Sequence, residues 1–285
     1  VKNELCNTID HLKVNNYTTF FIFSGVPIEQ IKNEYEGFLH TSLLFLNNIR
    51  EINVKIENPI ITYVDTIYDS GEYKQKVVID SNKKTEWRIY SKNDCSVVFP
   101  IVDGKISKLK LEDARIHAFL PTDDNTGLGI LVNADFSTDP SRRHLIFDDN
   151  TNESIKKISS LYYSLFKKHI VKNDDESKLI IDALLPYFDI RLVHFTNNAY
   201  YKQFSICIKE LSKSLSSIKL PPYWLNISDY SKMTETINCD CFNIVGFEAF
   251  LKFFDCKTES ITEILNKVED SNISIVGCAE IASYC

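Results

Sequence analysis

The chain has 285 residues, 44% of them hydrophobic and 25% charged, which suffices for one large or two ordinary domains and excludes a broadly disordered protein. Its formal net charge of -7 does not favour general binding to nucleic acid or to anionic membranes. Glycine is scarce, with 8 residues, and no GxxxxGK[ST] or GxGxxG motif occurs, which argues against a phosphate-cradling loop of either kind.

The cysteines indicate a reducing compartment. There are 8 of them and no CxxC pair, and Cys239 and Cys241 are too close together for an ordinary bridge and lack matching partners for zinc. We find no signal peptide and no apolar run near 18 residues. We therefore expect a cytoplasmic protein with reduced, mostly buried thiols and without a membrane partner.

The first half of the chain predicts a meandering sheet with one long helix. A strand is indicated at Thr18–Val26, which is aromatic and β-branched, and Pro27 then opens a helical pattern. The apolar residues of that pattern are Ile28, Ile31, Tyr35, Phe38 and Leu39, continuing toward Leu46. Strand-like pieces follow between Glu51 and Phe136: INVKI, IITYVDTIY, QKVVID, EWRIYS, SVVFPIV, ARIHAFL and GILVNADF.

Helices dominate after Asn150. Asn150 and Glu153 have the spacing of a capping box, and an apolar helical face from Ile155 to Phe166 follows. The charged run VKNDDESK is the best domain boundary. Further helices are predicted at LIIDALLPYF, at NNAYYKQFSICIKELSKSL, around Phe247, after Thr258 and at AEIASYC. We therefore predict an α+β fold, with an α+β domain over residues 1–172 and a mainly helical domain over residues 173–285.

The loop before the first of these helices carries two adjacent arginines, Arg142 and Arg143, within NADFSTDPSRRHLIFDDN. A guanidinium is always charged and offers a rigid fork of donors that suits phosphate oxygens, and the first amides of a helix also attract anions. The loop is therefore a candidate anion sensor. The alternative is that both arginines pair with the neighbouring acids Asp139, Asp148 and Asp149.

The stretch FLPTDDNTGLGILVNADFSTDPSRRHLIFDDN resembles the segment that follows the nucleotide-binding domain in sacsin and its bacterial relatives. The matching positions are Phe119, Leu120, Pro121, Thr122, Gly127, Leu128, Val132, Asn133, Phe136, Ser141, Arg142, Arg143 and Leu145. Gly129 departs from the pattern, since the family has proline there. The same layout is similar to the middle domain of the ninety-kilodalton heat-shock chaperone, and the resemblance covers roughly Thr18 to Ile170.

The resemblance implies a split βαβ transducer-like domain, a mixed sheet with helices, of a Bergerat-type (GHKL) ATPase. In that family the loop reaches the γ-phosphate of ATP held by the preceding domain. Carried over by position, Arg142 is the candidate γ-phosphate contact and Arg143 the runner-up, with Ser141 and Asn133 as accompanying cofactor-binding positions. The chaperone has glutamine at the position of Ile146, which cannot orient a water by hydrogen bonding, so the catalytic detail does not carry over.

The ATP site of that family is not expected within this chain. No DxGxG occurs, and NELCNTIDH only faintly resembles the asparagine-bearing helix. We therefore expect ATP and Mg²⁺ in a longer parent protein, no cofactor for this chain alone, and no catalysis by it. The resemblance implies the preceding ATP-binding domain and protein partners or clients as partners. It leaves a homodimer of the parent open and includes bacterial multidomain proteins linked to defence.

Two other functions stay open. One is a protein-interaction module with no nucleotide role, whose helices would expose an aromatic groove formed by Tyr200, Tyr201, Phe204, Phe247, Phe250, Phe253 and Phe254. The other is an independent metal-dependent hydrolase. Its candidate residues are Asp135, Asp139, Asp148, Asp149, His117 and His144.

Overall fold

A computed structural model describes residues 25–30, 33, 40–46, 48–54, 60–80, 83–188, 190–215, 218–234, 237–268 and 275–284. The chain divides into two units, Val1–Leu39 and His40–Cys285, and the second holds the sheet, the long helices and the candidate site. The predicted strand at Thr18–Val26, except its last two residues, and residues 31, 32 and 34–39 of the helix predicted after Pro27 lie outside the described residues. Residues 28–30 and 33 of that helix are helical.

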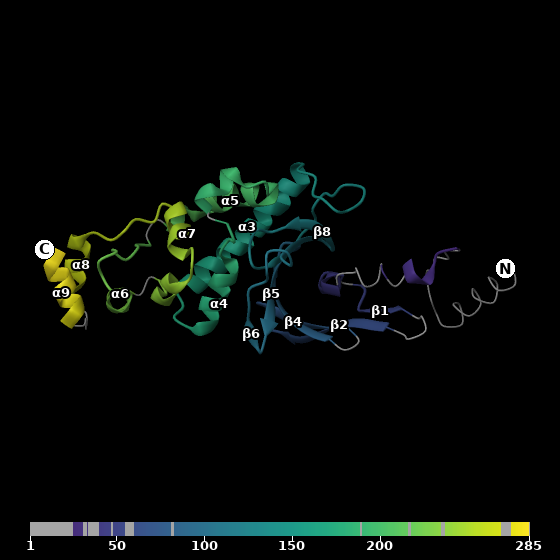
Figure 1. Cartoon of the computed structure of the whole chain (residues 1–285), viewed down its shortest axis with the longest axis horizontal. Coiled ribbons are helices and arrows are strands. Elements are labelled where there is room, and N and C mark those ends of the chain that lie inside the picture. Colours follow the sequence, from purple (N-terminus) through teal and green to yellow (C-terminus); the bar gives the residue numbers. More distant parts are fainter. Residues whose placement is uncertain are drawn as a thin grey trace. The chain divides into compact units, whose positions relative to one another are not determined.

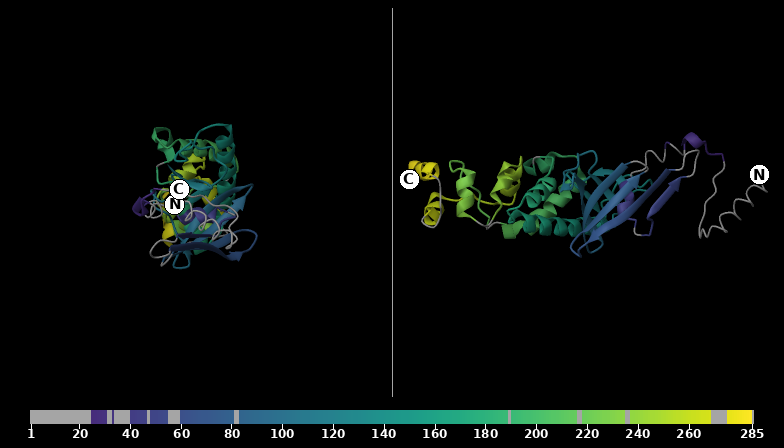
Figure 2. Two further views of the ribbon diagram at one scale, coloured as in Figure 1. Left: turned by 90° about the vertical axis from the view of Figure 1, so that its right-hand side faces the viewer. Right: turned by 90° about the horizontal axis from the view of Figure 1, so that it is seen from below.

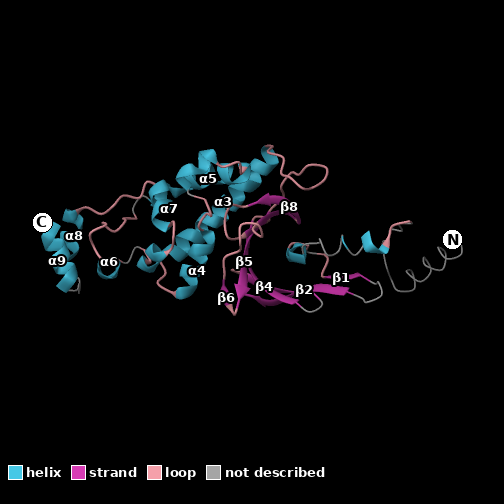
Figure 3. Cartoon of the chain, viewed as in Figure 1, coloured by secondary structure: helices cyan, strands magenta, loops and turns pink. Residues whose placement is uncertain are grey.

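The second unit is built on one mixed sheet, shown in magenta in Figure 3. Its strands within the described residues are β1 (Glu51–Val54), β2 (Ile60–Asp69), β3 (Lys74–Asp80), β4 (Lys83–Lys92), β5 (Cys95–Val102), β6 (Lys105–Ile106), β7 (Arg115–Ala118), β8 (Leu120–Asn125) and β9 (Leu131–Asn133). Their order is β1-β2-β3-β4-β5-β9-β7-β8, with β6 on the end of β5. The first five strands form the expected antiparallel meander, and Figure 2 shows them side by side from below.

The sheet departs from the meander at β7. The sequence predicts ARIHAFL as one strand, but the chain reverses at Phe119, whose φ of 63° is left-handed, so that β7 and β8 pair antiparallel. Strand β7 also pairs with β9, and this pair is parallel. The reversal places β8 at the edge of the sheet, next to the segment that follows β9.

Helices follow the sheet (Figure 1). They are α3 (Asp149–Ile170), α4 (Asp175–Leu184), α5 (Ala199–Leu211), α6 (Ile227–Met233), α7 (Phe247–Phe253), α8 (Ile261–Val268) and α9 (Ile275–Tyr284). Short 3-10 helices are η1 (His40–Leu44), η2 (Ile190–Phe195), η3 (Ser212–Leu215) and η4 (Cys239–Asn243). The predicted α+β class with a helical C-terminal part is confirmed. The predicted boundary between residues 172 and 173 falls between α3 and α4 and stays a prediction.

Two apolar layers cover the two faces of the sheet. Alternate residues of β4 and β5, such as Tyr90 and Val97, pack with α3 and the later helices in one continuous core. Their neighbours Ile89 and Val98 point to the other face and pack against Leu43 and its neighbours in and just after η1. This alternation follows from the two-residue period of a strand and explains why β5 is apolar almost throughout and why β4 is buried on both faces from Trp87 to Tyr90. The sheet is therefore covered on one face by α3 and on the other by η1.

Polar contacts that could not be predicted from the sequence join α4 to the sheet. Arg88 on β4 is buried, its Nη1 lies 2.6 Å from Oε1 of Glu176 on α4, and its guanidinium lies 4.4 Å from the centroid of the Tyr73 ring. The amide of Gly129 donates to the carbonyl of Ala183 at the end of α4, 3.0 Å away. A proline at position 129 could not make this bond, which gives a physical reason for the departure from the sacsin-like pattern.

Two helix starts differ from the prediction. The N-cap of α3 is Asp148, whose extended backbone lets its carboxylate accept from the amide of Thr151, so the predicted capping box at Asn150 is wrong. Helix α8 begins with a reciprocal pair, in which Ser260 and Glu263 each accept from the other's amide, rather than at Thr258. Both regions offer several capping residues in a row, and the backbone selects one of them.

No helix in the described part of the chain is long and apolar enough to cross a membrane.

Candidate functional site

The two arginines lie in a loop that joins β9 to α3, residues 134–148. The loop is closed on itself by an isolated bridge between Thr138 and Leu145, and its tip carries Ser141, Arg142 and Arg143. The carbonyl of Arg143 accepts from the amide of Asp123 on β8 at 2.7 Å. The edge strand β8 therefore holds the loop near its tip.

Asp139 organises the tip from inside. Its carboxylate accepts from the hydroxyl of Ser141 at 2.7 Å and from the amides of Arg143 and His144 at 2.8 and 3.3 Å, and its carbonyl accepts from the amide of Arg142. The hydroxyl of Ser141 and then the two amides hold the pKa of this carboxyl below its usual value. The carboxylate of Asp139 therefore accepts hydrogen bonds from the loop itself and does not pair with a neighbouring guanidinium among the described residues.

A second aspartate ties the loop to the sheet. Asp124 on β8 accepts from the amide of Leu145 at 2.7 Å, and its other oxygen lies 3.4 Å from Nδ1 of His144. The side chain of Leu145 is buried, while its neighbours on both sides are exposed. The loop is consequently fixed by the buried side chain of Leu145 and by two carboxylates, Asp139 within the loop and Asp124 on β8.

This fixed backbone presents both arginine side chains to solvent. Arg142 and Arg143 are exposed, and Arg142 has a left-handed φ of 60°, which costs an ordinary residue about 1 kcal/mol. The nearest charge contacts join Arg115 to Asp123 and His144 to Asp124, and neither Arg142 nor Arg143 forms an ion pair with any described residue. The alternative that both arginines are neutralised by Asp139 and its neighbours has no support in these contacts. Two guanidiniums that form no ion pair within the described part of the chain, on a loop held by these hydrogen bonds, fit a ligand oxyanion.

The helix start does not add to this site as the sequence suggests. The amide of Thr151 at the start of α3 is already bound to the carboxylate of Asp148, and hydrogen bonds from Thr151 and Ser137 lower the pKa of that carboxyl. A carboxylate at this end competes with any other anion there. The chemistry of the loop therefore rests on its guanidiniums, because the carboxylate of Asp148 already occupies the helix end.

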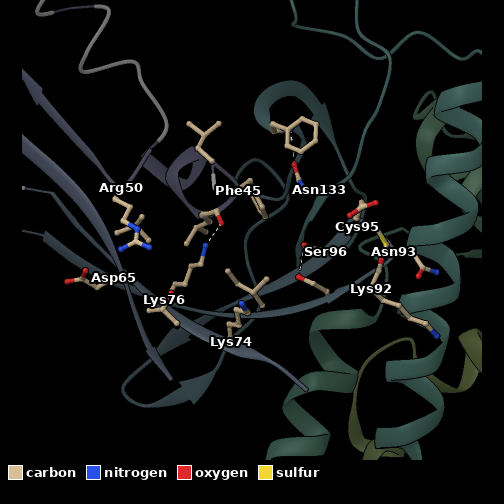
Figure 4. Close-up of a pocket in the computed structure, with 18 residues that line it drawn as sticks. Phe45, Arg50, Asp65, Lys74, Lys76, Lys92, Asn93, Cys95, Ser96 and Asn133 are labelled. Atoms are coloured by element: carbon tan, nitrogen blue, oxygen red, sulfur yellow. Dashed lines mark hydrogen bonds between the residues drawn. The ribbon is translucent and has the colours of Figure 1, made fainter. Parts of the chain in front are cut away.

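The other two predicted positions have structural partners. The only hydroxyl proton of Ser141 is donated to Asp139, so Ser141 shapes the loop. Asn133 is buried at the end of β9, and its Oδ1 accepts from the amide of Phe119 at 2.8 Å, which holds the reversed turn between β7 and β8. Figure 4 shows Asn133 at the edge of a cavity on the sheet. No described contact joins Asn133 to Arg142 or Arg143.

The residues behind the two other functions lie elsewhere in the fold. Among the aromatic residues expected to form a groove, all except Phe253 are buried in the core, with Tyr201, Phe204 and Phe247 at 0% exposure. They are core residues, not an exposed groove. Among the described residues there is no group of three or more His, Cys, Asp or Glu side chains placed to hold a metal ion. Asp139 and Asp148 instead accept hydrogen bonds within the loop and at the helix start.

Sequence reasoning missed the role of β8. The sequence predicts no strand after ARIHAFL until GILVNADF, yet LPTDDN forms an edge strand whose Asp123 and Asp124 hold the arginine loop. The signal was present in Asp124, whose carboxylate accepts from the amide of Leu145 in the loop, while Asp123 donates its backbone amide to the carbonyl of Arg143. Comparison with known proteins finds no matching family model, curated protein or solved structure.

Proposed function

We propose that this chain is the middle (transducer) and helical region of a GHKL-type, sacsin-like or chaperone-like ATPase. In this proposal Arg142 contacts the γ-phosphate of ATP that a preceding domain of the same protein holds, with Arg143 as the second candidate. The observation that supports it is the arginine loop: its backbone is fixed by Asp139 and by β8, while its two guanidiniums are exposed and pair with no described acid. The resemblance to bacterial family members links the proposal to defence proteins.

The physical basis is the charge of the ligand. ATP and Mg²⁺, when bound by the preceding domain, supply the phosphoryl group and its counter-charge. A guanidinium that touches the γ-phosphate stabilises the docked arrangement only while that phosphate is present. To move a two-state equilibrium from 1:99 to 99:1, the two states must differ in affinity by about 5.5 kcal/mol, and charge-assisted contacts from two guanidiniums can supply much of that.

The path from loop to helices is continuous in the fold. The loop ends at Asp148, which begins α3, and α3 packs against β5, α4 and α5. Arg88 and Glu176 join the sheet to α4. A displacement of the loop by a bound nucleotide therefore acts directly on the helix around which the C-terminal helices are packed.

The test is ATP turnover by the full-length protein. We expect Arg142→Ala to reduce turnover about tenfold or more, and Arg142→Lys to restore it only in part, because an ammonium lacks the planar fork. Arg143→Ala and the double variant establish which side chain dominates. Lys167→Ala, which removes one exposed charge from α3, serves as the control. Wild-type turnover in all the arginine variants would refute the proposal.

A further inference from the structure

A large cavity lies on the face of the sheet that η1 covers, away from α3. Its volume is about 770 Å³, within the range of pockets for small molecules. The segment from Leu44 to Leu46 forms one wall, and strands β2 to β5 with the end of β9 form its floor. Figure 4 shows Arg50, Lys74 and Lys76 on one side of the cavity and Ser96 and Asn133, with Lys92 nearby, on the other. None of these residues belongs to the arginine loop.

The charge of the lining is opposite to that of the chain. Four cationic side chains and two acidic ones line the cavity, whereas the whole chain carries a formal charge of -7. The cations are Arg50, Lys74, Lys76 and Lys92, and the acids are Asp65 and Asp94. A positive pocket on an acidic protein concentrates anions locally.

Three of the cations stand close to one another. Lys74 and Lys76 are two residues apart on β3 and so point to the same face. Lys76 is half-buried, its Nζ donates to the carbonyl of Leu44 at 2.7 Å, and burial, followed by the charges of Lys74 and Arg50, lowers its pKa. Lys74 pairs at 3.1 Å with the exposed Asp69, and Arg50 forms no ion pair with a described residue. Among the described residues, no buried acid therefore offsets the repulsion between Lys76 and the other two cations.

Register places a row of uncharged polar groups on the same face. Ser91 on β4 lies opposite Ser96 on β5, and Ser96 lies opposite Asn133 on β9. The hydroxyls of Ser91 and Ser96 are 2.8 Å apart. Because cross-strand neighbours share a face, the three side chains form one line of hydrogen-bonding groups along the cavity edge.

One end of that row carries an exposed aromatic ring. Phe119 lines the cavity at 40% exposure, in the left-handed turn that Asn133 holds through its amide oxygen. A phenylalanine in such a turn is strained by about 1 kcal/mol or more, and strain of this kind is concentrated at ligand sites. The cavity therefore combines cations, neutral hydrogen-bonding groups and an aromatic surface.

We propose that this cavity binds a small organic phosphate, with the phosphate facing Arg50, Lys74 and Lys76 and the aromatic or apolar part against Phe119. Convergent cations suit a dianion better than a single carboxylate. The ligand's hydroxyl or ring nitrogen groups face the row of Ser91, Ser96 and Asn133. The site is separate from the γ-phosphate contact and does not depend on it.

The experiment is calorimetric titration of the 285-residue chain with adenosine monophosphate, inorganic phosphate and adenosine at low salt. We expect adenosine monophosphate to bind, inorganic phosphate to bind at least tenfold more weakly, and adenosine to give no measurable binding. Arg50→Gln and Lys74→Gln, both at exposed positions, should each weaken binding of adenosine monophosphate about tenfold, and Lys83→Gln on β4 outside the cavity should not.

Several results would overturn the site. These are no binding of either phosphate compound, binding of adenosine as tight as that of its monophosphate, or equal affinity in Lys74→Gln and Lys83→Gln. Phe119→Ala separates the two halves of the proposal, because it should weaken the binding of adenosine monophosphate and leave the affinity for inorganic phosphate unchanged. If Phe119→Ala weakened the binding of both compounds to the same degree, the proposed role of the phenylalanine ring would be wrong. None of these variants alters Arg142, so the outcome is independent of ATP turnover.

Discussion

The chain should lose stability in mild acid because it buries a neutral histidine. His117 on β7 has 0% exposure, its ring centroid is 4.7 Å from that of Phe45, and its Nε2 lies 3.4 Å from the hydroxyl of Thr41. Burial away from water disfavours the imidazolium and lowers the pKa of His117 from 6.5 to about 4. Protonation of this ring is therefore coupled to unfolding.

The sign and size follow from linkage. Between the two pKa values the unfolded chain binds more protons than the folded chain, so the stability that His117 contributes is complete above pH 6.5 and is lost as the pH falls toward 4. With those values the free energy of unfolding falls by about 2 kcal/mol between pH 7.5 and pH 5. His169, whose pKa burial also lowers to about 4, contributes a separate loss of similar size.

Urea denaturation at pH 7.5 and pH 5 measures the effect. In His117→Gln and in His117→Phe, which keeps a ring beside Phe45, the difference in unfolding free energy between the two pH values should shrink by about 2 kcal/mol, whatever each substitution does at pH 7.5. The variant His169→Gln should reduce the pH dependence of the unfolding free energy independently, and in the double variant the two reductions should add. A variant at position 117 that keeps the full pH dependence of the wild type would show that this histidine is not the coupled group.

Three further outcomes test the geometry around the loop. Arg142→Gly should leave the free energy of unfolding unchanged or raise it by up to about 1 kcal/mol, because glycine adopts the left-handed φ of this position without strain. Arg143→Gly should lower the free energy of unfolding. A larger loss of stability in Arg142→Gly than in Arg143→Gly would contradict this reasoning. Asp148→Ala should cost about 1 kcal/mol by removing the N-cap of α3, and Asp148→Asn much less, both read from urea denaturation; equal losses would argue against capping. Gly129→Pro should destabilise by about 2 kcal/mol or more because it removes the amide bonded to Ala183, as thermal unfolding would show; unchanged stability would mean that this bond contributes little.

Strand and helix positions were largely predictable because burial imposes them. The apolar residues from Val77 to Ile79 in β3 and the nearly continuous apolar run of β5 reflect sheet faces that are partly or fully covered. The long apolar stripe of α3 likewise follows from packing on the sheet. These patterns involve residues that are close together in the sequence, and so they can be recognised in one sequence alone.

What the sequence did not reveal depends on contacts between distant residues. The reversal at Phe119 requires the amide oxygen of Asn133, 14 positions away, and no pattern within ARIHAFL indicates it. The choice of Asp148 over Asn150 as the N-cap depends on backbone angles that the loop sets. The cavity was missed for the same reason, because Arg50, Lys74 and Asn133 approach one another only through the sheet.

The position of the candidate site could be predicted from the sequence, but the hydrogen bonds that shape it could not. That Arg142 and Arg143 stand in a loop between a strand and a helix could be read from residues 133–150. That Asp139 and Asp124 bind backbone amides, so that the guanidiniums form no ion pair with a described residue, could not be predicted, since neighbouring acids in the sequence favour neutralisation equally well. The direction of a carboxylate, not its proximity in sequence, decides whether an arginine is available to a ligand.

Hydrogen exchange of residues 138–146 in the full-length protein tests the central claim most directly. With a non-hydrolysable ATP analogue we expect the amides of this loop to be protected relative to the ADP state, and we expect Arg142→Ala to abolish the difference while the exchange of α3 in the ADP state stays as in the wild type. The same exchange with the analogue and with ADP, in a protein shown to bind both, would contradict a γ-phosphate contact by this loop.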